Sequence, residues 1–283
     1  MRFLSIQSFV SYGHVGNSAA TFPLQRLGHE VWPVPTVVFS NHTGYGAWRG
    51  PLLAPDDVRA VVTGIAERGV LPTCDAVLSG YLGDPGICEV VVDAVGRVKA
   101  ANPEATYTCD PVMGNATSGC FVDPAIPTVI RERVVPHADV ITPNQFELGF
   151  LTDTSPDSLT STLDSAEAAL RMGPSTVLVT SVVRPDRPED TIEMIAVTGD
   201  GAWSVRTPRL PIQANGSGDL TAALFTAYLR ATGSPAVALG LTASSVVGVL
   251  RATIDAGERE LQIVLGQDAI ASPAGEFEVE QVR

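Results

Sequence analysis

The stretch Asn215-Gly216-Ser217-Gly218-Asp219 decides how this chain is read, and a mostly apolar run follows it directly. That run predicts a helix over residues 218–230. The glycine loop would present several backbone N–H groups at the positive end of the helix, which suits a phosphoryl group. Asp219 would repel such an anion, so it fits a base that takes a proton from an attacking hydroxyl. Asp is also a common helix N-cap, and the local pattern leaves both interpretations open.

The composition is that of a globular chain of 283 residues, with 45% hydrophobic residues and a formal net charge of −13. This length and apolar content predict one domain over residues 1–283. The acidic balance argues against a nucleic-acid partner and an anionic membrane surface. No run approaches 18 apolar residues, so no membrane span is expected. The start of the chain does not resemble a signal peptide. The four cysteines form no CxxC pair and predict reduced thiols in a cytoplasmic protein.

Short apolar runs alternate with helical patterns along the chain, which is typical of an α/β fold with a mainly parallel sheet and right-handed crossovers. Near the C-terminus, residues 260–264 predict a short strand. The other expected strands are 2–7, 30–36, 76–79, 105–109, 139–142, 176–181, and a hairpin of 192–198 and 202–207. The expected helices are 17–27, 55–68, 86–101, 124–133, 145–151, 159–172, 218–230, 235–255 and 267–271.

Residues that follow the strands are candidates for a site, because open parallel sheets bind ligands at the carboxyl ends of their strands. After the first two strands, residues 11–20 and 37–46 combine rings and hydrogen-bonding groups. They suit either irregular loops or the walls of a pocket for an aromatic ligand. Asn17 fits the N-cap of the first helix. Tyr81, in a glycine-bounded turn, fits packing as well as stacking on a flat ring.

Two acids and two hydroxyls follow the later strands. Asp110 and Glu147 could jointly hold Mg²⁺ through water, although Asp110 also fits a turn before proline and Glu147 a helix start with Pro143 at its first position. The hydroxyls of Thr180 and Ser181 could bind phosphate oxygens or satisfy their own turn. The polar loop 184–190 fits an exposed connection or a mobile cover over the site.

Acids for Mg²⁺, hydroxyls, an anion loop and one base together favour a phosphoryl transferase. The chain has neither a Walker A loop nor the protein-kinase signatures. A dinucleotide-binding oxidoreductase is disfavoured, because the glycine loop falls late in the chain and no acid follows a strand about 20 residues later.

Gly216-Ser217-Gly218-Asp219 resembles the Gly-x-Gly-Asp signature of the ribokinase superfamily, and further pieces resemble its pyridoxal kinase branch in the same order. These pieces are 5–8, 13–19, 39–43, 79–83, 109–114 and 141–147. The resemblance implies a ribokinase-like three-layer sandwich, in which helices flank a central, mostly parallel sheet. It also implies an ATP-dependent kinase, a phosphotransferase for the 5′-hydroxymethyl group of pyridoxal, with pyridoxine and pyridoxamine left open as further substrates.

The same resemblance implies roles for single residues. Asp219 would be the base, and the N–H groups of Gly216, Ser217 and Gly218 would form the anion hole. Mg²⁺ would be held by Asp110 and Glu147 through water, a monovalent cation such as K⁺ would lie near Thr142 and Thr180, and the enzyme would be a homodimer. Substrate-binding residues would be Ser8, His42, Thr43, Gly44, Tyr81 and Asp219. ATP-binding residues would be Asp110, Thr142, Asn144, Glu147, Thr180, Ser181, Thr207, Pro208, Arg209 and Leu210.

The chain also departs from the family pattern. Some members have an acid at the position of Asn115, bacterial relatives often have a lysine at that of Thr180, and the segment 208–215 is short. Two other functions fit less well. A hydroxymethylpyrimidine or sugar kinase would share the Asp219 loop but not the pocket at residues 40–43, and a vitamin-binding protein without catalysis would not need that loop.

Overall fold

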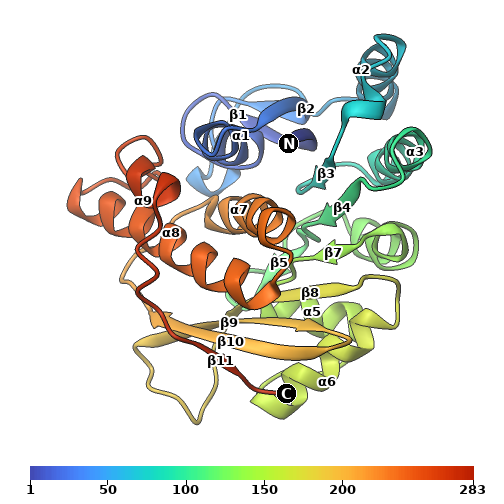
Figure 1. Cartoon of the computed structure of the whole chain (residues 1–283). Coiled ribbons are helices and arrows are strands. Elements are labelled where there is room, and N and C mark those ends of the chain that lie inside the picture. The colour runs from blue at the N-terminus through green and yellow to red at the C-terminus, as the bar shows by residue number, and fades with distance from the viewer.

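A nine-stranded sheet, in the order β11-β10-β9-β8-β7-β4-β3-β1-β2, forms the centre of the computed structural model, which describes residues 1–283 (Figure 1). The strands from β2 to β8 in this order are parallel, whereas β9, β10 and β11 are each antiparallel to the strand before them. The sheet comprises β1 (Arg2–Val10), β2 (Glu30–Phe39), β3 (Ala76–Ser79), β4 (Thr106–Cys109), β7 (Val140–Ile141), β8 (Thr176–Val182), β9 (Thr191–Thr198), β10 (Gly201–Pro208) and β11 (Val279–Gln281). A separate small hairpin is formed by β5 (Gly114–Asn115) and β6 (Gly119–Cys120).

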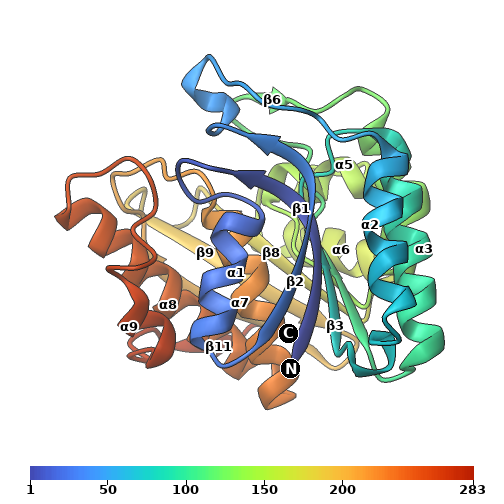
Figure 2. The same ribbon diagram turned by 90° about the horizontal axis from the view of Figure 1, so that it is seen from above.

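Helices cover both faces of the sheet, which confirms the predicted three-layer α/β arrangement (Figures 1 and 2). One face of the sheet is covered by α1 (Asn17–Arg26), α7 (Ser217–Thr232), α8 (Pro235–Asp255) and α9 (Gln267–Ala271). The opposite face carries α2 (Pro55–Glu67), α3 (Pro85–Ala101), α4 (Ile126–Val129), α5 (Gln145–Thr152) and α6 (Leu159–Leu170).

The core lies in two layers, one on each side of the sheet. A cluster of 37 buried residues lies between the sheet and α2–α6, and clusters of 16 and 9 lie on the side of α7. Central strands such as β3 are buried along their whole length, because both of their faces are covered. Inside this layer a hydrogen bond of 2.9 Å from Thr226 to Thr108 joins α7 to β4. The centre of the sheet and α7 therefore form one packed unit.

The strand predicted at residues 260–264 is wrong, and the strand β11 was missed. Leu261 and Ile263 pack into the apolar cluster beneath α8 rather than joining the sheet. The backbone N–H of Gln262 donates to Oγ1 of Thr253, at 2.9 Å, so it is not available for strand pairing. The alternating apolar pattern fits burial under a helix as well as it fits a strand.

Two helix starts also differ from the prediction. Gly16, with a φ of 53°, is the N-cap of α1, whereas Asn17 donates from Nδ2 to the carbonyl groups of Gln7 and Val34 and so joins β1 to β2. The helix expected at residues 124–133 is α4 followed by the π-helix Ile130–Val134. An apolar repeat does not distinguish this wider turn from an α-helix.

Helix α8 is long and apolar enough to cross a membrane, with a mean hydropathy of 1.7 in its most apolar window. We expected no membrane-spanning run from the sequence, because small polar residues such as Thr242 and Ser244 interrupt the apolar residues of α8. Within the protein, 56% of that window is buried, and the helix packs against α7, β9 and β10. Its hydropathy is therefore explained by its place in the core.

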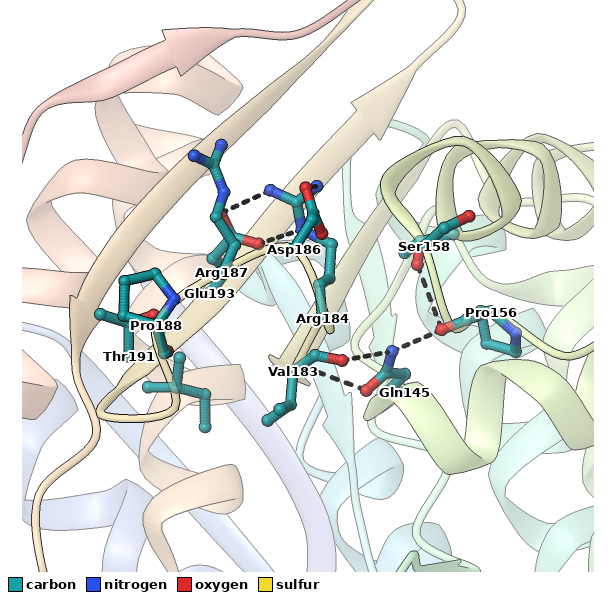
Figure 3. A network of polar contacts seen from close by, with 12 residues as sticks. Gln145, Pro156, Ser158, Val183, Arg184, Asp186, Arg187, Pro188, Thr191 and Glu193 are labelled. Carbon is teal, nitrogen blue, oxygen red and sulfur yellow. Dashed lines mark hydrogen bonds and ion pairs between the residues drawn. The ribbon is translucent and has the colours of Figure 1, made fainter.

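The loop between β8 and β9 is anchored by a buried ion pair (Figure 3). Arg184 and Glu193 are 4% and 3% exposed, and Nε and Nη2 of Arg184 donate to the two Glu193 oxygens at 2.6 and 3.0 Å. The hydrogen bond to Glu193 raises the pKa of Arg184. Gln145 of α5 donates to the carbonyl of Val183 and accepts from its N–H. The residues from 185 to 190 are mostly exposed, as one interpretation predicted, but the base of the loop is fixed.

We expect Arg184→Met to lower the free energy of unfolding by about 3–5 kcal/mol, because Glu193 would keep a buried charge without a partner. The double variant Arg184→Met/Glu193→Leu should recover most of that loss, since neither charge remains. Arg187→Met is the control, because the Arg187 side chain is 31% exposed and its Nε lies 3.5 Å from Oε1 of Glu193, farther than the 2.6 Å contact of Arg184. Urea unfolding of the four proteins measures these differences. A double variant as unstable as the single one would contradict this account.

Candidate active site

The glycine loop forms the start of α7, and Asp219 is not its cap. Gly216 is the N-cap, with a φ of 87° and no side-chain cap, so Asp219 is the third helical residue. The interpretation of Asp219 as the N-cap is therefore wrong. The first intrahelical bond runs from the N–H of Leu220 to the carbonyl of Gly216, which leaves the N–H groups of Ser217 and Gly218 without a partner in the protein. Such a helix start suits an anion.

Close backbone contacts hold this loop against the connection that follows β1. A Cβ atom at Gly216 would lie 1.8 Å from the carbonyl oxygen of His14, so only glycine fits there. A Cβ atom at Gly16 would lie 2.3 Å from both oxygens of Ser8. These two contacts stack the start of α7 on the β1–α1 connection and that connection on Ser8. The structure therefore brings Ser8 and the glycine loop together, although more than 200 positions separate them in the sequence.

Asp219, Asp110 and Glu147 share one electrostatic environment. Desolvation raises the pKa of Asp219 to about 6, against the opposing effect of the N–H groups of Gly16 and of Asp219 itself. Burial raises the pKa of Asp110 well above its ordinary value, and the charges of Glu147 and Asp219 raise it further. Burial also raises the pKa of Glu147 to about 7. The charge of Asp219 also raises the pKa of Glu147, so Asp219 disfavours ionisation of both other acids, and a nearby cation would reverse that effect.

Glu147 is held by backbone groups from two segments. Its Oε1 accepts from the N–H groups of Met113 and Gly114 at 2.9 and 3.3 Å, and its Oε2 accepts from the N–H of Asn144 at 2.9 Å. Asn144 caps α5 by accepting from the N–H of Glu147. Pro143 therefore precedes the cap, and the prediction that it is the first helical residue is wrong. The helix-start interpretation of Glu147 therefore holds, and both of its carboxylate oxygens already accept backbone hydrogen bonds.

The donor set fits a hydrated Mg²⁺ ion rather than a metal enclosed by protein ligands. No three or more His, Cys, Asp or Glu side chains are arranged to hold a metal ion. Mg²⁺ needs no such set, because it keeps several waters and binds substrate phosphates. Asn115, where some relatives carry an acid, instead accepts from Thr117 and Ser118 in the β5–β6 turn. Asp110 and Glu147 remain the acids that face this region.

The hydroxyl of Thr142 fits a second cation. Thr142 is 3% exposed, and its buried Oγ1 makes no hydrogen bond within 3.5 Å, although it lies close enough to Asp110 to lower the pKa of that carboxyl. Thr180 lies nearby, because its N–H donates to the carbonyl of Pro143 at 2.9 Å. Ser181 follows with a φ of 55°, a left-handed backbone that non-glycine residues seldom adopt. A strained position of this kind is common at ligand sites.

The segment 207–210 lies at the same edge of the sheet but contacts a different loop. Thr207 is buried and donates to the carbonyl of Ile192 at 3.4 Å, and the N–H of Arg209 donates to the carbonyl of Asp190 at 2.7 Å. Pro208 and Arg209 are exposed, whereas Leu210 is partly buried. No hydrogen bond joins the segment to the three acids, and its polar contacts are with Ile192 of β9 and Asp190 of the β8–β9 loop.

The residues predicted to bind the substrate lie at or just after the ends of β1, β2 and β3. Ser8 is 7% exposed and lies where the β1–β2 register shifts. His42 precedes the short 3₁₀ turn Thr43–Tyr45, and its Nδ1 accepts from the N–H of Gly44 at 3.0 Å. Burial lowers the pKa of His42, so its ring is neutral with the proton on Nε2. Tyr81 is half-buried, and Thr36 donates to its carbonyl at 2.8 Å. Thr43 and Gly44 are exposed.

Sequence reasoning missed two residues beside this site, Arg259 and Glu260. Glu260 was predicted in a strand, but it lies outside any strand. Its side chain is buried and accepts a hydrogen bond from Tyr45 Oη at 2.7 Å. No local motif marks this pair, because 215 positions separate the two residues. A cavity of about 520 Å³ lies elsewhere, lined by residues such as Arg131, Leu151 and Met172, and it contains none of the predicted site residues.

Comparison with known proteins agrees with this geometry. The model of the phosphomethylpyrimidine kinase family matches residues 55–263. The chain is 67% identical to Pyridoxal kinase PdxY of Leifsonia xyli subsp. xyli and 59% identical to that of Corynebacterium diphtheriae, with all of each chain covered in both cases. Pyridoxal kinase from Leishmania donovani in complex with ADP and pyridoxamine has the same fold, with a TM-score of 0.93, 28% identity, and coverage of 100% of this chain and 99% of that one. The chain therefore belongs to the pyridoxal kinases of the ribokinase-like superfamily.

Proposed function

We propose that this protein transfers the γ-phosphate of ATP to the 5′-hydroxymethyl group of pyridoxal, which yields pyridoxal 5′-phosphate. The observation that carries the proposal is Asp219, a carboxyl with a pKa of about 6 beside the unpaired N–H groups of Ser217 and Gly218. A base of this pKa is ionised at neutral pH and still close enough to it to accept a proton. The adjacent N–H groups are placed to stabilise charge on the transferred phosphoryl group.

In this mechanism, Asp219 takes the proton as the hydroxyl oxygen attacks the γ-phosphorus in line with the leaving ADP. Ser8, His42 and Tyr81, with Thr43 and Gly44 of the exposed turn, bind and orient pyridoxal. Nε2–H of neutral His42 is a donor for a polar group of the substrate. Gly216 lets the loop approach the β1–α1 connection, while the N–H groups that follow it hold the phosphoryl oxygens.

The ATP side is formed by the second group of predicted residues. Asp110 and Glu147 would hold Mg²⁺ through water, and the ion when bound would neutralise charge on the phosphates. Buried Thr142 Oγ1 supports a monovalent cation such as K⁺ near Thr180. ATP itself would be lined by Asn144, Ser181, Thr207, Pro208, Arg209 and Leu210. The single domain over residues 1–283 is supported by the continuous sheet; the homodimer and the cytoplasmic location stay predictions.

A second candidate is phosphorylation of a hydroxymethylpyrimidine. It is favoured by the family model and by a putative phosphomethylpyrimidine kinase from Bacteroides thetaiotaomicron, with a TM-score of 0.90 and 25% identity. Full-length identity of 67% to a pyridoxal kinase favours the first candidate. Competition between pyridoxal and a hydroxymethylpyrimidine for turnover separates the two.

We expect Asp219→Asn to lower kcat by about 10²–10⁴-fold, because the amide cannot accept the proton of the attacking hydroxyl. Affinity for ATP should change little, since Asp219 faces the acceptor. Formation of pyridoxal 5′-phosphate, followed by its absorbance, measures kcat, and ATP titration of the variant measures binding. Asp200→Asn, in the exposed β9–β10 turn, is the control. Near-normal turnover of Asp219→Asn would exclude the assigned base.

Asp219→Asn should also stabilise the ligand-free protein, but only at higher pH. The folded-state pKa of about 6 lies above the ordinary value of 3.8, so the folded protein holds a proton that the unfolded chain releases. The free energy of unfolding of the wild type therefore falls as pH rises through about 4 to 6. We expect the variant to be more stable by about 2–3 kcal/mol near pH 8 and nearly equal near pH 4 in urea unfolding. A difference that does not vary with pH would contradict the raised pKa.

Gly216→Ala and Gly218→Ala should fail in different ways. A Cβ atom at Gly216 meets the His14 carbonyl, so we expect lost stability. A Cβ atom at Gly218 meets nothing within 4 Å, so we expect unchanged stability. Its kcat should still fall by at least about tenfold, because the added methyl group enters the space proposed for the phosphoryl group. Thermal unfolding and turnover measure the two effects, and a fully active Gly218→Ala would contradict this placement of the phosphoryl group.

A further inference from the structure

After α8 the chain returns to the substrate side of the site. This segment, red in Figure 2, includes Arg259 and Glu260 and lies beside the loops that follow β1 and β2. It belongs to none of the motifs that mark the site. Both residues are charged, and both contact those loops rather than solvent alone.

Glu260 joins the two loops through one buried carboxylate. It is 5% exposed, its Oε1 accepts from Tyr45 Oη at 2.7 Å, and its Oε2 accepts from the N–H of His14 at 3.3 Å. A Cβ atom at Gly13, which has a φ of 89°, would lie 1.9 Å from the same Oε2. The sequence thus provides the glycine that lets this carboxylate approach. A buried charge is costly unless it is hydrogen-bonded, so Glu260 favours the arrangement in which both loops supply their donors.

Arg259 contacts the same turn on another side. Its guanidinium carbon lies 4.0 Å from the centroid of the Tyr45 ring, and its Nη2 donates to the carbonyl of Gly44 at 3.1 Å. The cation therefore stacks on the ring whose hydroxyl binds Glu260. Tyr45 is held at its face and at its hydroxyl by two adjacent residues of a distant segment.

These contacts lie directly behind the residues that face the reactants. The carbonyl of His14 is the surface on which Gly216 packs, and the N–H of Gly44 fixes His42 by donating to its Nδ1. A shift of the His14 peptide would therefore move the start of α7, and a shift of the turn would move His42. Glu260 and Arg259 limit both movements at once.

We propose that Arg259, Glu260 and Tyr45 form a clamp that positions the pyridoxal-binding turn against the phosphoryl-binding loop. The clamp residues are positioning residues, because they act through His14, His42 and Gly44. The proposal rests on the proposed function for its substrate and predicts a selective effect on pyridoxal, since the ATP-side residues are held by Glu147 and Asn144.

Two variants weaken the clamp while keeping its shape, Tyr45→Phe and Glu260→Gln. We expect each to raise KM for pyridoxal by about 5–20-fold, because a hydrogen bond to a charged group is lost or weakened. KM for ATP and kcat should stay within about threefold. Tyr228→Phe is the control for the first variant, because it also removes a hydrogen-bonded tyrosine hydroxyl, but one that bonds to Ser245 and Ile270 away from the site. Glu276→Gln, whose side chain pairs with Arg251 at a more exposed site, is the control for the second.

Hydrogen exchange of the ligand-free protein gives a readout that does not require turnover. The amides of Tyr45 and Gly46, which bond within the turn, should exchange faster in both variants, while amides within α3 stay unchanged. Unchanged exchange at the turn, or an equal rise in KM for ATP, overturns the clamp. If the wild type shows no turnover of pyridoxal but exchange changes as expected, the proposed substrate fails and the clamp stands.

Discussion

The cost of ionising three neighbouring desolvated carboxyl groups, those of Asp110, Glu147 and Asp219, is the constraint on which the site depends. Asp110 and Glu147 are buried, and the charge of Asp219 raises the pKa of each of them. Ionised acids so close together are unfavourable without a cation, and three backbone N–H groups offset only part of the cost at Glu147. The ligand-free site is therefore poised for a cation and its phosphates, and their arrival would lower all three pKa values.

The protein holds the two sides of this site by different means. On the side proposed to bind ATP, backbone donors fix Glu147, and the buried pair of Arg184 and Glu193 fixes the loop beside the segment 207–210. On the side proposed to bind pyridoxal, side chains from the segment after α8 hold the turn that follows His42. The glycine loop of α7 touches that second side through the contact of Gly216 with His14. Phosphoryl transfer needs this alignment, because it gains mostly from positioning and charge stabilisation.

Much of the architecture follows from local pattern. Nearly continuous apolar strands such as β3, alternating with helices, predict a parallel sheet covered on both faces, and this is what forms. Residues 260–264 were wrongly assigned to a strand, because alternation records burial and not hydrogen-bond partners. Asn17 was wrongly assigned to a cap, since its amide bonds to two strands instead. In both cases a tertiary contact, rather than the local sequence preference, set the structure.

The sequence by itself determined the fold class, the parallel sheet and the position of Asp219 after a glycine loop, because these depend on periodicity and on residues adjacent in the chain. It could not choose between a helix cap and a base for Asp219, since both need an acid at a helix start. Only the tertiary structure excluded the cap, by making Gly216 the N-cap, and only it placed Asp219 near Asp110 and Glu147. It alone also brought Arg259 and Glu260 to Tyr45, because such contacts depend on how the chain returns after α8 and leave no trace in local sequence.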